Sequence, residues 1–381
     1  MGRLPKNKEI EENDDKILTP EQQALNYLKA NKENHYNFEE DSFIKIPSSS
    51  LILNGALGGG LCFGAHRFVG INSGGKTSCA LDFMMNFLKE KNNRRGIYFR
   101  CEGRLSPELR IRTGVEFTLD PNLWSDGVCL IFDSNIYETV FGFIRDLIIN
   151  NPNKVKYFFI LDSLDNMVKK DDLAKPLEEA SMVAGGALIT SVFLKKTALA
   201  LAKRSHIAIF VSQIRDEIKI NQYQQTTQRQ GKSSGGHAIE HNASTVVDFL
   251  ARYNDDLIRE NPGDRNSKII GHKCKIRLIK TDNEKNLTEI SYPICYGRKG
   301  GKSVWREYEI IDLLLMWSML GRKGDKGAWF NFEEKILIEL KQIDNEFPEK
   351  VQGLDNLRQV LEEKPIITDY LYTKFSNLLT N

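Results

Sequence analysis

The chain has 381 residues, 41% of them hydrophobic and 27% charged, which is the composition of an ordinary soluble globular protein. Its 53 basic and 51 acidic residues nearly cancel, so any surface for nucleic acid must be local. No apolar run approaches the ~18 residues of a membrane-spanning helix, and six cysteines without a C-x-x-C pair exclude a disulfide framework and a zinc site. We therefore expect a cytoplasmic protein that has no contact with a membrane.

The N-terminal part of the chain differs from the rest. Residues 1–18 are dominated by Lys, Asn, Glu and Asp, which predicts a disordered leader. Thr19-Pro20-Glu21-Gln22 then supplies an N-cap, a proline at the first helical position and an acidic first turn. We expect residues 19–45 to form a helical oligomerisation arm that docks on a neighbouring subunit. Packing on its own domain is an equally open interpretation.

The sequence Gly70-Ile-Asn-Ser-Gly-Gly-Lys76-Thr77 matches the phosphate-loop pattern G-x-x-x-x-G-K-[ST], between a strand pattern and a helix pattern. Backbone N–H groups can surround phosphate oxygens there, Lys76 can reach the terminal phosphates, and the Thr77 hydroxyl can bind Mg²⁺. We therefore predict a nucleoside triphosphate site, and the alternative is a chance match. The predicted nucleotide-binding residues are Gly70, Ile71, Asn72, Ser73, Gly74, Gly75, Lys76, Thr77 and Ser78.

Three later strand patterns each end in a polar side chain, namely Glu102, Asp162 and Gln213. In open α/β sheets, ligands gather outside the carboxyl ends of the strands, so these side chains should face the phosphates. Glu102 is suited to activate the attacking water, and Asp162 to complete the Mg²⁺ site with Thr77. Gln213 is placed to sense the γ-phosphate. The simpler alternatives are a helix cap or surface acid for Glu102 and a helix cap for Asp162.

Residues 215–236 are rich in Gln, Lys, Thr, Ser and Gly and contain few core-forming residues. A long structureless stretch inside a compact domain is usually functional or disordered, and this composition suits contact with a nucleic-acid backbone. Alternating strands and helices precede the stretch and consecutive strands follow it, which predicts an α/β fold with a mostly parallel central sheet and an antiparallel extension. Periodic segments over residues 331–381 predict a small helical C-terminal domain.

In this order and spacing, the motifs resemble the bacterial RecA recombinase family over about residues 40–335, and phage recombinases such as UvsX are similar. The motifs are Leu57–Gly64, the phosphate loop, Tyr98–Glu102, Leu161–Ser163, Val211–Arg215, Gly235–Ile239, Cys295–Gly297 and Gly327–Trp329. The divergence would suit a phage or other mobile-element version. The resemblance implies a RecA-type P-loop core over residues 46–330, with ATP and Mg²⁺ as cofactors.

The resemblance also implies residue roles. Glu102, Lys76 and Gln213 would be catalytic, and Lys280 would reach the ATP of a neighbouring subunit. DNA loops would lie near residues 168–185 and 215–236. The implied DNA-binding residues are Lys195, Arg215, Ile218, Ser234, Gly235 and Gly236. The implied function is an ATPase that forms a helical filament on single-stranded DNA and pairs it with double-stranded DNA.

Some residues depart from the family pattern. Leu109 stands where the family has an aromatic that stacks on adenine, Asp282 replaces the second of two basic residues, and Glu240-His241 replaces a Lys-Phe pair. Two other functions stay open, and the departures at Asp282 and Glu240 bear on the second of them. The chain could be a hexameric helicase-type motor built on the same core, or a low-turnover paralogue that coats DNA.

Overall fold

The N-terminal helix belongs to a unit of its own. The computed structural model describes residues 18–39, 42–103, 105–173, 175–176, 184–213, 236–261, 263–284, 286–322 and 328–380. The chain divides into two compact units, Met1–Asp41 and Ser42–Asn381. In the first, α1 (Pro20–Ala30) precedes the short helix η1 (Lys32–Asn34), and Thr19 caps α1 through the predicted N-cap interaction. No residue of α1 is buried. Apart from Leu18, the predicted leader lies outside the described residues.

The second unit is built on a ten-stranded mixed sheet. In spatial order its strands are β10 (Thr288–Cys295), β9 (Ile269–Lys280), β7 (Thr245–Phe249), β1 (Gly64–Gly70), β6 (Ile207–Gln213), β5 (Lys156–Asp162), β2 (Arg94–Arg100), β4 (Val128–Phe132) and β3 (Glu116–Thr118), and β8 (Leu257–Arg259) pairs with β9. All pairs from β7 to β3 are parallel, whereas β9 runs antiparallel to both β7 and β10. The predicted α/β class, with its antiparallel extension, is therefore confirmed.

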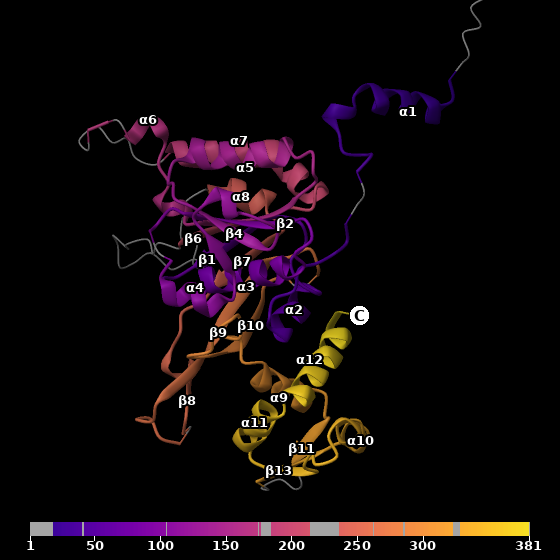
Figure 1. Ribbon diagram of the computed structural model, residues 1–381, viewed down its shortest axis with the longest axis vertical. Helices are drawn as coiled ribbons and strands as arrows, with labels where there is room; N and C mark the ends of the chain where they lie inside the picture. The colour runs from indigo at the N-terminus through magenta and orange to yellow at the C-terminus, as the bar shows by residue number, and fades with distance from the viewer. Residues whose placement is uncertain are drawn as a thin grey trace, which may run out of the picture. The chain divides into compact units, whose positions relative to one another are not determined.

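Helices cover both faces of this sheet (Figure 1). One face carries α5 (Tyr137–Ile149), α7 (Ala184–Lys203) and α8 (Gly236–Asn242), and the other carries α3 (Lys76–Lys89) and α4 (Pro107–Thr113). The short elements are η2 (Pro121–Leu123), η3 (Leu164–Asn166), α6 (Lys170–Leu173) and η5 (Asn254–Asp256). No helix within the described ranges is both long enough and apolar enough to cross a membrane.

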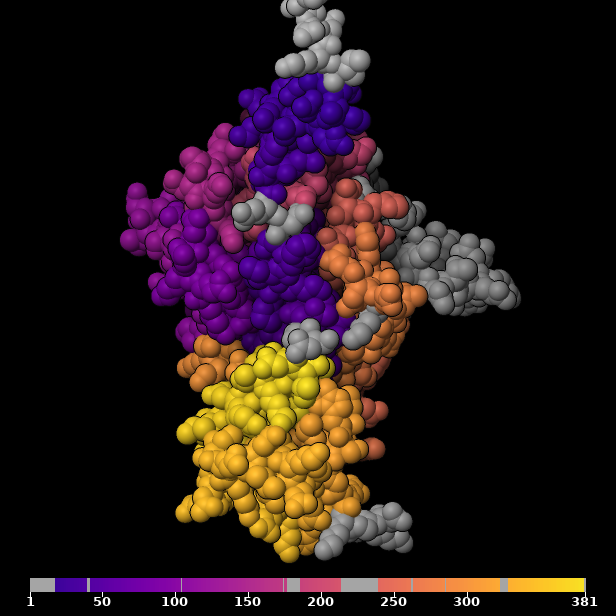
Figure 2. Space-filling model, turned by 90° about the vertical axis from the view of Figure 1, so that its right-hand side faces the viewer, coloured from indigo at the N-terminus to yellow at the C-terminus, as the bar shows by residue number. Residues whose placement is uncertain are grey.

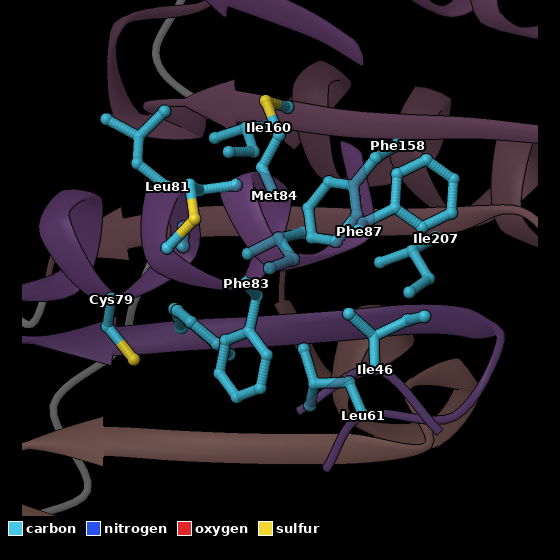
Figure 3. Packing of buried hydrophobic residues seen from close by; sticks show 14 of the residues in the cluster. Ile46, Leu61, Cys79, Leu81, Phe83, Met84, Phe87, Phe158, Ile160 and Ile207 are labelled. Carbon is cyan, nitrogen blue, oxygen red and sulfur yellow. The ribbon is translucent and has the colours of Figure 1, made fainter. Parts of the chain in front are cut away.

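The main core lies between α3 and the central strands. Phe83 and Phe87 of α3 point toward the sheet, where Phe87 packs against Phe158 of β5 with ring centroids 5.4 Å apart (Figure 3). β5 is buried along almost its whole length because helices cover both of its faces, which is why its sequence is a continuous apolar run rather than an alternating one. This packing fixes the ends of β1, β2, β5 and β6 relative to the start of α3.

The C-terminal part is helical, as predicted, but it also contains a small sheet. Its elements are α9 (Arg306–Met316), β11 (Leu320–Arg322), β12 (Trp329–Phe332), α10 (Glu334–Ile343), β13 (Lys350–Gln352), α11 (Leu354–Glu363) and α12 (Pro365–Thr380). Strands β11, β12 and β13 pair antiparallel. The expected boundary at residue 331 falls inside β12, and the hydrophobic cluster of this part already begins in α9. Strands of three or four residues are too short for their alternation to be visible in the sequence.

A buried polar junction joins the C-terminal part to the nucleotide core, next to α2 (Leu51–Leu57). The Ser50 hydroxyl donates to Glu309 of α9, and the Leu51 N–H donates to the other oxygen of Glu309 at 2.9 Å. Ser49 donates from its N–H to Asp82 of α3 at 2.7 Å. The C-terminal residues form a contiguous yellow block beside the indigo part of the same unit (Figure 2). Glu309 is fully buried, and burial raises its pKa to about 8.

Candidate nucleotide and catalytic site

The phosphate loop leaves the sheet at a point where only glycine fits. Gly70 ends β1 with φ 144°, and a Cβ added there would lie 2.3 Å from the carbonyl oxygen of Phe249 in the neighbouring strand β7. Gly75 precedes α3 with φ 107°, and a Cβ there would lie 3.2 Å from the Cys274 sulfur. The loop therefore passes close to β7 and β9 and leaves its backbone N–H groups at the N-terminus of α3, which favours anions.

Replacing Gly70 with Ala should lower the free energy of unfolding by about 3 kcal/mol, because the added Cβ meets immovable backbone atoms and the backbone conformation disfavours side chains. Chemical denaturation measures this change. The matched control is Gly142→Ala in α5, where an added Cβ meets nothing within 4 Å. That control should be neutral or stabilising, since alanine is the better helix former. Equal stability of the two variants would contradict the proposed close approach.

Lys76 is buried at the start of α3. Its ammonium donates to the carbonyl oxygens of Gly70 at 3.0 Å and Ile71 at 2.6 Å. Burial lowers the pKa of Lys76, and four surrounding carboxylates oppose that change, those of Asp162, Asp165, Glu102 and Asp248. The lysine thus lies inside the loop, among acidic groups that favour its charged form.

The two residues predicted to bind Mg²⁺ lie together. The Thr77 hydroxyl donates to Asp162 Oδ2 at 2.6 Å, and the Tyr98 hydroxyl donates to the same oxygen at 2.7 Å. Asp162 is 8% exposed; burial raises its pKa, while these two hydrogen bonds lower it. Burial also raises the pKa of Tyr98 well above its ordinary value, which keeps its hydroxyl protonated as a donor. The carboxylate is therefore fixed in orientation by both hydroxyls.

Glu102 and Gln213 also lie together, although their strands are not neighbours. β5 lies between β2 and β6, and all three are parallel, so their carboxyl ends meet at one edge. Gln213 Nε2 donates to Glu102 Oε1 at 3.2 Å, and the Ser163 hydroxyl donates to the same oxygen. The Gln213 N–H donates to Asp165 Oδ2 at 2.6 Å. The predicted water-activating carboxylate and the predicted sensor are thus in direct contact.

A pocket of about 500 Å³ opens beside the phosphate loop. Its walls are Ser73–Cys79 of the loop and α3, the end of α4, and residues of β9 and β10. Arg112 of α4 donates to the Ser78 hydroxyl at 3.1 Å, and Arg252 donates to the Ser73 carbonyl oxygen at 3.3 Å. Leu109 instead packs against the main core and does not line this pocket. The side chains that lie next to the phosphate loop in this pocket are therefore those of Arg112 and Arg252, and not that of Leu109.

These residues fit ATP with Mg²⁺. The pocket volume lies within the range of small-molecule sites, and side chains at Gly70 and Gly75 would collide with Phe249 of β7 and with Cys274 of β9, which lie directly beside the loop. The Thr77 hydroxyl and the Asp162 carboxylate are oxygen donors of the kind that Mg²⁺ prefers. Among the described residues, no group of three or more His, Cys, Asp or Glu side chains could hold a metal ion. Mg²⁺ would therefore rely on nucleotide oxygens as well, as it commonly does.

The remaining predicted residues lie elsewhere or outside the described ranges. Lys280 ends β9 and donates to the carbonyl oxygens of Glu240 and His241 at 3.2 and 3.1 Å, so its described hydrogen bonds do not reach the phosphate loop of its own chain. Lys195 is exposed on α7. Gly236 is the first residue of α8. Four predicted DNA-binding residues fall outside the described residues, namely Arg215, Ile218, Ser234 and Gly235, as does part of the loop expected near 168–185.

The departures from the family pattern have partners within the chain. The Cys62 thiol donates to Asp282 at 2.6 Å, and burial raises the pKa of Cys62 to about 12. Glu240 forms an ion pair with Arg67 at 2.8 Å. Sequence reasoning missed Tyr98, Asp165 and Arg67. Only Arg67 gave a clear signal, as a charge in the middle of an apolar strand pattern.

Comparison with known proteins places these features in context. Residues 33–300 match the family profile described as RecA N-terminal domain. Three curated relatives are each named Protein RecA. The one from Bifidobacterium breve is 25% identical over 331 residues (86% of this chain, 72% of the relative), that from Acholeplasma laidlawii strain PG-8A 25% over 337 (88% and 87%), and that from Aquifex aeolicus strain VF5 25% over 333 (86% and 82%).

Proposed function

The chain belongs to the RecA family, and we propose that it is a DNA-dependent ATPase that forms filaments on single-stranded DNA and exchanges strands with a homologous duplex. The observation that carries the proposal is the contact between Glu102 and Gln213. Gln213 is the last described residue before the segment 214–235, which overlaps the expected second DNA loop. DNA bound by that segment would therefore lie next in the chain to Gln213, the hydrogen-bond partner of the water-activating carboxylate.

In the proposed ATP hydrolysis, each of the site residues has a separate role. Bound ATP would supply the phosphoryl group for transfer to water, and Mg²⁺, when bound, would neutralise charge on the phosphate oxygens. The phosphate loop and Lys76 would hold and orient those oxygens, and Asp162, which accepts the hydrogen bond from Thr77, would help that hydroxyl to hold the metal. Glu102 accepts a proton from the attacking water, and Gln213 reports the γ-phosphate to the DNA segment. Enzymes of this kind act mainly by positioning and electrostatics, so the fixed strand ends are what the chemistry needs.

Filament assembly would use residues that make contact with a neighbouring subunit or with DNA. We assign residues 19–45 to an arm that docks on a neighbouring subunit, because no residue of α1 is buried and α1 belongs to the separate unit Met1–Asp41. Lys280 would approach the neighbour's ATP from the end of β9. The DNA contacts are assigned to the loops near 168–185 and 215–236 and, on α7, to Lys195, whose exposed ammonium suits a phosphate backbone.

One observation favours the low-turnover, DNA-coating alternative. Asp282 stands where the family has a second basic residue, and its carboxylate accepts a hydrogen bond from Cys62. A carboxylate there cannot neutralise charge on a neighbour's ATP, so the contribution of the neighbouring subunit to hydrolysis would rest on Lys280 alone. Slow turnover with normal DNA binding is the result that this alternative predicts.

The deciding experiment measures ATP hydrolysis by the wild-type chain with and without single-stranded DNA, together with filament formation in electron micrographs. The proposed recombinase should hydrolyse ATP at least about tenfold faster on DNA, because coupling energies between sites commonly produce such factors. Helical filaments and exchange of a labelled strand should follow. Closed hexamers that move along DNA would favour the helicase-type motor, and DNA binding with negligible turnover would favour the DNA-coating paralogue.

A further inference from the structure

Arg67, in the middle of β1, is among the largest fully buried side chains of the described residues. Its guanidinium donates to Glu240 of α8 at 2.8 Å and, through Nε, to the Ser212 hydroxyl of β6 at 3.4 Å. Burial lowers the pKa of Arg67, and the carboxylates of Glu240 and Asp165 oppose that change. A charge in this position is tolerated only while it is paired, because breaking such a pair leaves a buried charge uncompensated.

The two partners of Arg67 lie on either side of the segment 214–235. Ser212 lies just before this segment in β6, and Glu240 lies just after it in α8. β1 pairs with β6 on one side and with β7 on the other, and Arg67 of β1 bonds to one residue that precedes the segment and to one that follows it. The Arg67 side chain therefore connects β6 to α8, the two described elements that flank the segment in the sequence.

Arg67 is also connected, through β6, to Glu102, the proposed water-activating carboxylate. Gln213 follows Ser212 directly, its N–H is bonded to Asp165, and its side-chain amide is bonded to Glu102. Asp165 also acts electrostatically on Arg67. A displacement of α8 would therefore move Glu240, whose side chain is 48% exposed, relative to the buried guanidinium of Arg67. Through Ser212 of β6, the same displacement would reach the groups that contact Glu102. A basic residue at position 240, as the resemblance leads one to expect, could not pair with Arg67.

We propose that the Arg67–Glu240 ion pair is a positioning device that links helix α8 to the Glu102–Gln213 contact, so that single-stranded DNA accelerates ATP hydrolysis through it. The proposal rests on the proposed function for the identity of the ligand. The mechanical link itself does not depend on that ligand, because it consists of contacts within one chain. Neither residue touches the reacting atoms, so both act through Gln213.

The test compares Glu240→Gln with wild type in two measurements. The ratio of kcat with DNA to kcat without DNA should fall about tenfold, a typical size for the coupling between two sites. KM for ATP and kcat without DNA should change less than about twofold. In the second measurement, a slowly hydrolysed ATP analogue should slow hydrogen exchange of the α8 amides in wild type, and this protection should be lost in the variant. The exchanged pair Arg67→Glu with Glu240→Lys should restore both responses.

Glu289→Gln is the matched control, because Glu289 also pairs with an arginine, Arg277, but on the exposed face of β9 and β10. It should leave both measurements unchanged, and thermal unfolding shows whether each variant is folded. The proposal is overturned if Glu240→Gln keeps its DNA stimulation, or if kcat falls equally with and without DNA. If wild type shows no DNA stimulation, the proposed function fails. In that case the exchange measurement alone decides whether the pair links the nucleotide to α8.

Discussion

Glu102→Gln is expected to lower kcat for ATP hydrolysis at least about 100-fold in the presence of single-stranded DNA, since a general base commonly contributes 10²- to 10⁴-fold. Glutamine keeps an oxygen that can accept the hydrogen bonds from Ser163 and Gln213. It cannot take a proton from water, so binding should survive while hydrolysis fails. Steady-state hydrolysis and equilibrium binding of Mg²⁺-ATP, measured on the same preparation, separate the two effects.

Glu116→Gln, an exposed acid in β3, is the control and should leave both kcat and affinity unchanged. If Glu102→Gln retained kcat within about threefold of wild type, Glu102 would not be the base. Asp165 would then be the next candidate, because its carboxylate is bonded to the Gln213 N–H in the same cluster. An equal loss of nucleotide binding and kcat would instead make Glu102 a structural part of the pocket.

The features that the sequence predicts well are local ones. The phosphate loop is a contiguous motif, and the strand that ends at Asp162 is a continuous apolar run. In a parallel sheet such runs predict the fold class directly, because buried strands need helices on both faces. The meeting of Glu102 with Gln213 was also predictable, since the carboxyl ends of parallel strands share one edge.

The contacts that could not be predicted from the sequence join residues that are far apart along the chain. The Tyr98 hydroxyl reaches Asp162 over 64 positions, and Arg67 reaches Glu240 over 173. No spacing rule pairs such residues, because strand order in the sheet, not distance along the chain, brings them together. The C-terminal sheet was missed for a different reason, since its strands are too short to show alternation.

The second large expected effect is that the free energy of unfolding falls as pH rises, because Glu309 is buried at the junction with the C-terminal part. The pKa of Glu309 is about 8 in the folded chain, because burial outweighs the hydrogen bonds from Ser50, Leu51 and Ile52 that lower it. An ordinary glutamate in the unfolded chain titrates near 4.3. Between these values the folded chain binds more protons, so this contribution to stability is fully present below the unfolded pKa and is lost as pH rises through about 8.

Wild type should therefore lose about 1.4 kcal/mol of unfolding free energy per pH unit relative to Glu309→Gln, or about 4 kcal/mol in all between pH 5 and pH 8. Glutamine stays neutral over this range and can still accept the Leu51 N–H while donating to the Ser50 hydroxyl. Urea denaturation at several pH values measures the difference, and Glu334→Gln on the exposed face of α10 should behave as wild type. Parallel pH profiles for wild type and Glu309→Gln would mean that the carboxylate is buried in its charged form. The N-terminus of α2, through the Ser50 hydroxyl and the Leu51 N–H, would then stabilise that charge at the junction between the nucleotide core and the C-terminal part.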